Sequence, residues 1–209
     1  MIISHSLRKT VEKITRGGNQ NGFSLIELVV GLGVAAIAMA AVVSVFTTLT
    51  RSYTTQNASA NVQQIVRAGV DYMAQNIRMA GLNPVNIPDV GIVAATPTTI
   101  EFTVDRNLNG VIDESDDEHM VFDFISAERR INQGLYIGTG SQNWNSLVNN
   151  VSNLVFNYFD EAGNDLGVTP DLAEIRSVGI ILTVAQPSGQ RGNIDRTYSA
   201  RVRCRNLGL

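Results

Sequence analysis

Two groups of residues in this sequence have the types and the spacing needed for chemistry. The first is the segment Gly22-Phe23-Ser24-Leu25-Ile26-Glu27, where one carboxylate stands at the start of an otherwise apolar run. An intramembrane carboxylate costs roughly 2.5–3.5 kcal/mol on insertion scales, so such an acid is a functional hypothesis that needs a partner. Cleavage after Gly22 would supply that partner, because it would create a positively charged amine on Phe23, four residues from Glu27.

The second group is an oxygen-rich stretch at residues 105–116 with a glycine in its middle. Side-chain oxygens fall at positions 1, 3, 5, 9 and 12 of this stretch, and Gly110 stands at position 6. This is the spacing of an EF-hand-type calcium loop, in which glycine permits the sharp turn and alternating oxygens surround one hard cation. The predicted ligands of one calcium ion are Asp105, Asn107, Asn109, the carbonyl of Val111, Asp113 and Asp116.

The last ligand position of this loop departs from the usual pattern. Asp116 stands where most such loops have glutamate, and its shorter side chain predicts a weak affinity, in the extracellular range of roughly 10⁻⁴–10⁻³ M. A simpler explanation of the same residues is an Asn109-Gly110 turn flanked by solvated acids.

A membrane helix is expected to position the first group. No charged residue occurs from position 28 to 50, and the most apolar part, residues 28–46, approaches the roughly 20 residues needed to cross a bilayer core. Positive charge precedes this run and the next charge, Arg51, follows it, so the N-terminus is expected on the cytoplasmic side. The basic residues that precede it are Arg8, Lys9, Lys13 and Arg16, against one acid, Glu12.

The same helix is expected to continue beyond the membrane. Apolar residues recur at helical spacing, no proline interrupts before Pro84, and Gly81 is placed to cap the C-terminus. The recurring residues are Val62, Ile65, Val66, Gly69, Val70, Met73, Ile77 and Ala80. We therefore predict a helix over residues 23–80, with 23–50 as its transmembrane and assembly half. Residues 51–82 are its amphipathic continuation, whose apolar stripe packs on a sheet.

Residues 83–209 are expected to form an exported β-rich globular domain. Short alternating runs broken by turns predict strands at 99–104, 119–126, 134–137, 154–159, 175–183 and 196–204. Gly163-Asn164 reads as a turn and residues 186–192 as a loop. The fold class is therefore α+β, with a long N-terminal helix packed on an antiparallel sheet that carries the loop at 105–116.

The N-terminal segment closely resembles the cleavage and methylation motif of type IV prepilins and type II secretion pseudopilins. The resemblance implies that a prepilin peptidase on the cytoplasmic side cuts between Gly22 and Phe23 and methylates the new amine of Phe23. It also implies that residues 1–22 are a leader that is removed. Glu27 then assists methylation and pairs with the terminal amine of a neighbouring subunit during assembly. The implied fold is pilin-like.

Shorter segments farther along the chain resemble one branch of this family, the PilW-like minor pilins and their J-type pseudopilin relatives. These segments are residues 78–81, 151–156, 158–160, 175–178 and 205–206. The branch implies a structural subunit that initiates or caps a type IV pilus, with prepilin peptidase, other major and minor pilins and the pilus assembly platform as partners. The alternatives are a minor pseudopilin of type II secretion and a calcium-dependent surface-binding or adhesive tip module.

The family resemblance also implies a location. The chain would begin as a single-pass protein of the inner membrane and end in a pilus, the periplasm or the cell surface. An ordinary secretory signal is a competing explanation, because Ala38-Met39-Ala40 before Ala41 satisfies the small-residue cleavage rule. That signal would be unusually long and would carry an acid before its apolar core. An uncleaved anchor is the third explanation, and the N-terminal residue of the mature protein separates all three.

Composition argues against several function classes. The 209 residues carry a net charge of −3, which becomes −6 once the basic leader is removed, and no Lys/Arg patch follows the leader in the sequence. Nucleic-acid binding is therefore not expected. After the leader one histidine, His119, and one cysteine, Cys204, remain, both in predicted strands, and no phosphate loop or zinc spacing occurs. We predict a structural protein and not an enzyme.

Overall fold

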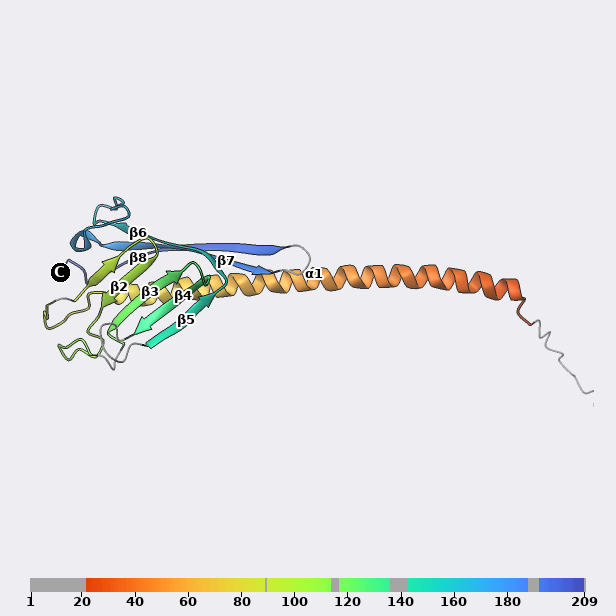
Figure 1. The fold of residues 1–209 in the computed structure, drawn as a ribbon, viewed down its shortest axis with the longest axis horizontal. Coiled ribbons are helices and arrows are strands. Elements are labelled where there is room, and N and C mark those ends of the chain that lie inside the picture. Colours follow the sequence, from red (N-terminus) through yellow and green to blue (C-terminus); the bar gives the residue numbers. More distant parts are fainter. Residues whose placement is uncertain (1–21, 89, 114–116, 136–142, 188–191, 209) are drawn as a thin grey trace, which may run out of the picture. The chain divides into compact units, whose positions relative to one another are not determined.

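The computed structural model describes residues 22–88, 90–113, 117–135, 143–187 and 192–208. The chain divides into two compact units, Met1–Leu49 and Thr50–Leu209, and each is described by itself. One long helix, α1 (Leu25–Met79), begins in the first unit and ends in the second (Figure 1). Its bounds lie within two residues of the predicted helix at 23–80.

In the first unit, α1 is apolar on every side and exposed at every residue from 25 to 49. Ile26, Val34, Ile37 and Phe46 each expose more than half of their side chains. A helix that is hydrophobic all round is typical of a membrane span or of the interior of a larger assembly. Within this unit, the apolar surface of α1 is available to lipid or to other chains.

In the second unit, one face of α1 is buried. The buried residues recur every three or four positions: Val62, Val66, Gly69, Val70, Met73, Asn76 and Ile77. All except Asn76 belong to the predicted stripe, and the predicted Ile65 is half-buried. Gly69 marks the tightest approach, because a Cβ there would lie 2.8 Å from Val148 and 3.3 Å from Leu182. Gly81 follows the helix with φ +79°, a conformation that glycine adopts without strain.

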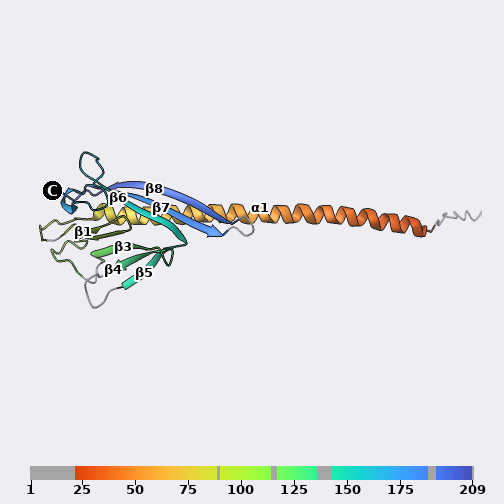
Figure 2. The same cartoon turned by 45° about the horizontal axis from the view of Figure 1, so that its top comes forward.

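Eight strands form two antiparallel sheets in the described part of the second unit. The five-stranded sheet has the order β1 (Ile92–Ala95), β2 (Thr99–Thr103), β3 (His119–Ile125), β4 (Arg130–Leu135), β5 (Asn143–Asn149). The three-stranded sheet has the order β6 (Val151–Phe159), β7 (Ser177–Pro187), β8 (Asn193–Arg203), with the 3₁₀ helix η1 (Leu172–Glu174) before β7. Figures 1 and 2 show the C-terminal half of α1 between the two sheets.

The chain passes from the first sheet to the second at a single residue. Asn150 separates β5 from β6 and has φ +59°, a left-handed conformation that asparagine tolerates better than most residues. The amide of Val151 donates to the carbonyl of Arg129 at 2.8 Å, and the amide of Ala185 donates to the carbonyl of Asn150 at 2.9 Å. The turn is therefore bonded to both sheets.

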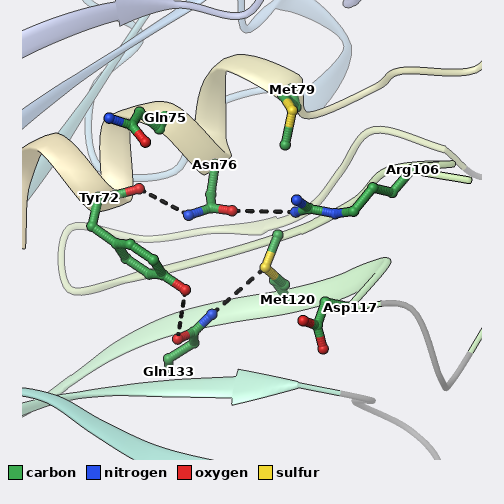
Figure 3. A pocket seen from close by; sticks show the side chains of 8 residues that line it. All are labelled: Tyr72, Gln75, Asn76, Met79, Arg106, Asp117, Met120 and Gln133. Carbon is green, nitrogen blue, oxygen red and sulfur yellow. Dashed lines mark hydrogen bonds between the residues drawn. The ribbon is translucent and has the colours of Figure 1, made fainter.

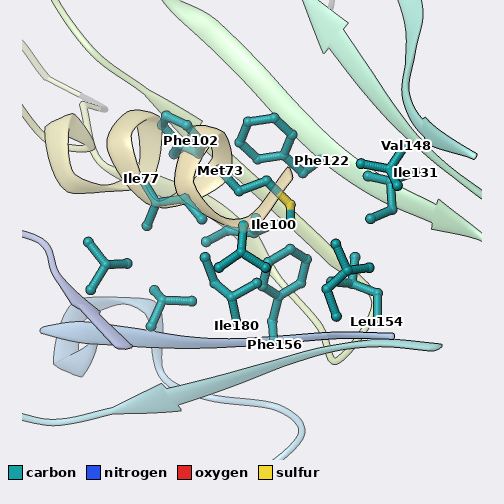
Figure 4. Packing of buried hydrophobic residues seen from close by; sticks show 14 of the residues in the cluster. Met73, Ile77, Ile100, Phe102, Phe122, Ile131, Val148, Leu154, Phe156 and Ile180 are labelled. Atoms are coloured by element: carbon teal, nitrogen blue, oxygen red, sulfur yellow. The ribbon is translucent and has the colours of Figure 1, made fainter. Parts of the chain in front are cut away.

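One hydrophobic core fills the space between α1 and the sheets (Figure 4). Its largest fully buried side chains include Met73, Phe102, Phe122, Phe156 and Tyr158. Fully burying side chains of this kind contributes about 1.5–3 kcal/mol each. Because the helix and both sheets contribute to it, this core fixes the strands and the loops at their ends.

The observed architecture confirms the predicted α+β class but corrects the strand assignment. The sequence predicts one sheet of six strands, whereas the described residues contain two sheets and the additional strands β1 and β5. β5 has the sequence NWNSLVN, in which polar residues mask the alternation. The strand predicted at 134–137 lies instead at Arg130–Leu135, because Asn132 and Gln133 are polar but buried. β7 begins later than predicted and extends to Pro187, into the predicted loop.

Candidate functional site

The residues of the predicted cleavage site lie just before the helix. Gly22 and Phe23 are exposed and non-helical, and the side chain of Phe23 is 83% exposed. The amide of Leu28 donates to the carbonyl of Ser24 at 3.1 Å, which closes the first turn. The peptide bond between Gly22 and Phe23 is therefore accessible. The predicted leader, apart from Gly22, lies outside the described residues.

Glu27 stands in the first turn of α1 and is exposed. A carboxylate in this position is favoured by the partial positive charge at a helix N-terminus, typically by 0.3–1 kcal/mol. Within the described part of the chain it makes no ion pair. The carboxylate is thus free to meet a charge supplied by another chain.

Helix α1 is long and apolar enough to cross a membrane. By length and composition it is the one such helix among the described residues, and its most apolar window has a mean hydropathy of 2.6 and no buried residue. A soluble core helix would bury such a window. The helix therefore suits membrane anchoring.

The predicted calcium loop connects β2 to β3. Asp105, at position 1 of the loop, is completely buried. Its two carboxylate oxygens accept backbone N–H bonds from Asn109 at 3.1 Å and from Gly110 at 3.0 Å. Gly110 has φ +81°, so the sharp turn expected at position 6 is present. The loop wraps around the carboxylate of Asp105.

Three further predicted ligands lie together in this loop. The side-chain oxygen of Asn107 accepts the amide of Asn109 at 2.9 Å, and that of Asn109 accepts the amide of Val111 at 2.8 Å. The amide nitrogens of both asparagines donate to one carboxylate oxygen of Asp113. Side chains at positions 3, 5 and 9 therefore converge, although a bound cation would require the asparagines to present oxygen in place of nitrogen.

The remaining members of the predicted ligand set are placed differently. Asp116 lies outside the described residues. No group of three or more His, Cys, Asp or Glu side chains arranged to hold a metal occurs in the ranges that the structure describes. A cation in the loop would thus depend on amide and backbone oxygens and on Asp116 as well as on Asp105 and Asp113.

Glu118 is a loop residue outside the predicted ligand set, and its structural role was not predicted. It is fully buried, and one carboxylate oxygen accepts the amides of Arg106 at 2.7 Å and Asn107 at 3.0 Å. The other oxygen accepts the amide of Asp113 at 2.7 Å. Glu118 therefore ties the two sides of the loop together. The sequence feature that could have indicated this role is an acidic residue directly before β3, but Glu118 lies two residues beyond the twelve-residue calcium pattern.

A pocket of about 330 Å³ lies between α1, the loop, β3 and β4 (Figure 3). Tyr72 donates to the side-chain oxygen of Gln133 at 3.1 Å, and Arg106 donates to the side-chain oxygen of Asn76 at 3.2 Å. The two charged residues of its lining, Arg106 and Asp117, both come from the loop. The conformation of the loop therefore determines which charged side chains line this pocket.

The single histidine and cysteine after the leader have structural surroundings. His119 in β3 lies 2.7 Å from a carboxylate oxygen of Glu101 in the neighbouring strand. Cys204 directly follows β8 and is 2% exposed, and burial raises the pKa of its thiol to about 12. Such a thiol stays protonated at neutral pH, so it is a poor nucleophile.

The N-terminal segment matches a known family model. Residues 17–43 match the model described as the prokaryotic N-terminal methylation motif. The matched range contains Gly22, Phe23 and Glu27 together with the first part of α1. No curated protein matches the chain as a significant relative.

Proposed function

Because residues 17–43 carry the N-terminal methylation motif of type IV prepilins and pseudopilins, we propose that the chain is a minor pilin of the PilW kind. In this role it is a structural subunit that initiates or caps a type IV pilus. The motif implies processing by a prepilin peptidase and assembly with other pilins, and it points to a structural protein rather than an enzyme.

The observation that carries the proposal is the combination of an exposed apolar helix with a Glu27 that forms no ion pair to any residue that the structure describes. Cleavage after Gly22 leaves an amine on Phe23, and methylation keeps that amine positively charged. In the low dielectric of packed helices, the attraction between this amine and the Glu27 carboxylate of a neighbour is far stronger than in water. Lateral packing of the apolar helices then buries the surface that each subunit exposes alone.

A substitution of Glu27 tests this mechanism. In cells that express the epitope-tagged full chain, Glu27→Ala should leave the protein in the membrane and remove it from sheared filaments. The exposed acid Glu174 provides the control, since Glu174→Ala alters the charge equally but should be incorporated normally. Intact mass should show methylated Phe23 at the wild-type N-terminus. Normal entry of the Glu27→Ala protein into filaments would refute the assembly role.

A minor pseudopilin of type II secretion is the alternative in the same family, since the motif is common to both. Deletion of the gene separates them: loss of surface pili supports a minor pilin, whereas retained pili with failed export of secreted enzymes supports a pseudopilin. Neighbouring genes for minor pilins or for secretion components would point in the same directions.

A second role is favoured by the loop at residues 105–116, where we propose that one calcium ion binds. What supports it is the buried Asp105, bonded at loop positions 5 and 6, together with the convergence of Asn107 and Asn109 on Asp113. Bound calcium would order the loop and the pocket beside it. A calcium-dependent adhesive tip would use this end of the exported domain.

Thermal unfolding of the full chain in detergent tests the calcium site. Millimolar calcium should raise the melting temperature, because an ion that binds only the folded state stabilises it. Asp105→Ala should abolish this rise, whatever it does to the melting temperature without calcium. Asp165→Ala is the matched control, since Asp165 also accepts the amide of a turn glycine, Gly167, but lies outside the loop. A wild-type chain that is indifferent to calcium and to chelator would exclude the site.

A further inference from the structure

A groove between α1 and β8 collects positive charge that is far apart in the sequence. It has a volume of about 450 Å³, and its lining includes Gln63, Gln64 and Arg67 from α1 and Arg196 and Tyr198 from β8. We call these five residues the arginine groove. Among the described residues no acidic side chain lines it. The groove is therefore cationic, with amide groups beside the charges.

Arg67 is held with its guanidinium over an aromatic ring. The carbon at the centre of the guanidinium lies 5.5 Å from the centre of the Tyr198 ring, within the range of a cation–π contact. A cation–π contact engages the charge of the guanidinium with a ring that carries no charge of its own. The ring thus orients Arg67 without neutralising it.

Arg196 is held by hydrogen bonds to uncharged groups. One terminal nitrogen donates to the hydroxyl of Ser59 at 2.7 Å, and the other donates to the carbonyl of Asp195 at 3.1 Å. These contacts use two of the five donors of a guanidinium. Within the described residues neither Arg67 nor Arg196 forms an ion pair, whereas Arg130 and Arg203 are bridged to Glu128 and Glu161.

The charge of the groove is opposite to that of the chain as a whole. After residue 22 the sequence holds 12 arginines, no lysine and 18 acidic residues. A neighbouring subunit of similar composition therefore carries more carboxylates than cationic groups. Arginine recognises carboxylates by paired N–H bonds, and the amides of Gln63 and Gln64 can bond to the backbone of an extended peptide.

We propose that the arginine groove docks an acidic, extended segment of a neighbouring subunit. The two guanidinium groups bind carboxylates of that segment, and the groove between helix and strand accommodates its backbone. The existence of a neighbouring subunit rests on the proposed function. The binding chemistry itself does not, so it is measurable on the isolated chain.

Fluorescence anisotropy with the full chain in detergent tests the groove directly. The probe is fluorescein-labelled hexaglutamate, and hexaglutamine with the same label is the uncharged control. Hexaglutamate should bind, hexaglutamine should not, and added salt should weaken binding because the contact is electrostatic. The double substitution Arg67→Gln with Arg196→Gln should weaken binding about tenfold or more. Arg205→Gln, which removes an exposed charge outside the groove, should leave it unchanged.

Three results would overturn the proposal. The first is that the wild-type chain does not bind hexaglutamate, and the second is that the double variant binds it as tightly as wild type. The third is that Arg205→Gln weakens binding as much as the double substitution does. A fourth result also refutes it: the two arginines are needed for binding to vesicles with anionic phospholipid, but not for binding to hexaglutamate. That outcome would assign the groove to a lipid surface. Unchanged melting temperatures of the variants keep each outcome interpretable.

Filament incorporation separates this inference from the proposed function. If Arg67→Glu with Arg196→Glu is cleaved and methylated normally but is lost from filaments, the groove acts in assembly, as proposed. If these reversals are incorporated as well as wild type, the docking role is wrong. If Glu27→Ala enters filaments while hexaglutamate binding persists, the proposed function fails and the peptide-binding groove remains.

Discussion

The phenol oxygen of Tyr158 in β6 lies 2.8 Å from the carbonyl oxygen of Thr96, which precedes β2, and this hydrogen bond joins the two sheets. The same hydroxyl lies 3.1 Å from the carbonyl of Thr99. Tyr158 is completely buried, so its O–H group has to find a partner inside the protein. Together with the amide of Phe156, which donates to the carbonyl of Pro97 at 2.8 Å, this side chain holds the turn before β2 against the second sheet.

Tyr158→Phe should destabilise the folded chain by about 0.5–1.5 kcal/mol, because it removes the hydrogen bond from the buried phenol to the carbonyl of Thr96. Urea unfolding of the full chain in detergent measures this loss. Tyr198→Phe is the control, since the ring of Tyr198 keeps its contact with Arg67 after the hydroxyl is removed. A urea midpoint equal to that of wild type would show that the hydrogen bond from Tyr158 to Thr96 adds nothing to the free energy of unfolding.

Alkaline pH should weaken the fold through Cys204. Burial raises the pKa of the folded thiol to about 12 from an ordinary value near 9. The unfolded chain therefore loses this proton first, and the contribution to stability is present below pH 9 and falls as the pH rises from 9 to 12. Cys204→Ala should flatten this decline. At pH 8, iodoacetamide should label Cys204 only after unfolding, and rapid labelling of the native chain would contradict its burial.

Two glycines of α1 should respond oppositely to the same substitution. Gly69→Ala places a methyl group 2.8 Å from Val148, so the core must shift at a cost of about 1–3 kcal/mol. Gly33→Ala meets nothing within 4 Å and improves helix propensity by about 1 kcal/mol. Circular dichroism measures the helix content of the two variants, and urea unfolding measures their stability. Equal effects would mean that packing at Gly69 is looser than described.

The carboxylate of Glu118 should matter to the loop even without calcium. Glu118→Gln replaces one acceptor oxygen by an amide nitrogen, so at least one of its three backbone bonds is lost. We expect a loss of about 1–3 kcal/mol and faster proteolysis between β2 and β3. Glu174→Gln, an exposed acid in η1, should change neither. If the loop of the Glu118→Gln variant resists proteolysis as well as the wild-type loop does, the carboxylate of Glu118 does not stabilise it.

The parts of this fold that depend on local pattern were predictable from the sequence. The buried stripe of α1 follows from helical spacing, and the place of Gly81 follows from the need for a left-handed residue after a helix. The segment that matches the methylation motif is contiguous, so Gly22, Phe23 and Glu27 could be predicted together as cleavage and assembly residues. The calcium spacing was equally readable, but spacing alone does not reveal whether an ion binds.

What could not be predicted depends on contacts between distant segments. β5 is polar in sequence and becomes a strand by pairing with β4. The pairing of Arg67 with Tyr198 joins residues 131 positions apart, and no sequence window contains both. The division into two sheets turns on Asn150, a single residue whose left-handed backbone no periodicity indicates. Glu118 was hidden because its partners are backbone amides rather than side chains.

The burial of α1 against both sheets governs how the second unit can open. Gly69 faces Val148 of one sheet and Leu182 of the other, so removing the helix from either sheet exposes the core of both. Local fluctuations that release one sheet alone are therefore costly, and the central amides of β3 and β7 should exchange with solvent water at the same slow, global rate. A fragment that begins after residue 77 would lose more than an anchor, because it would lack the middle layer of its own core.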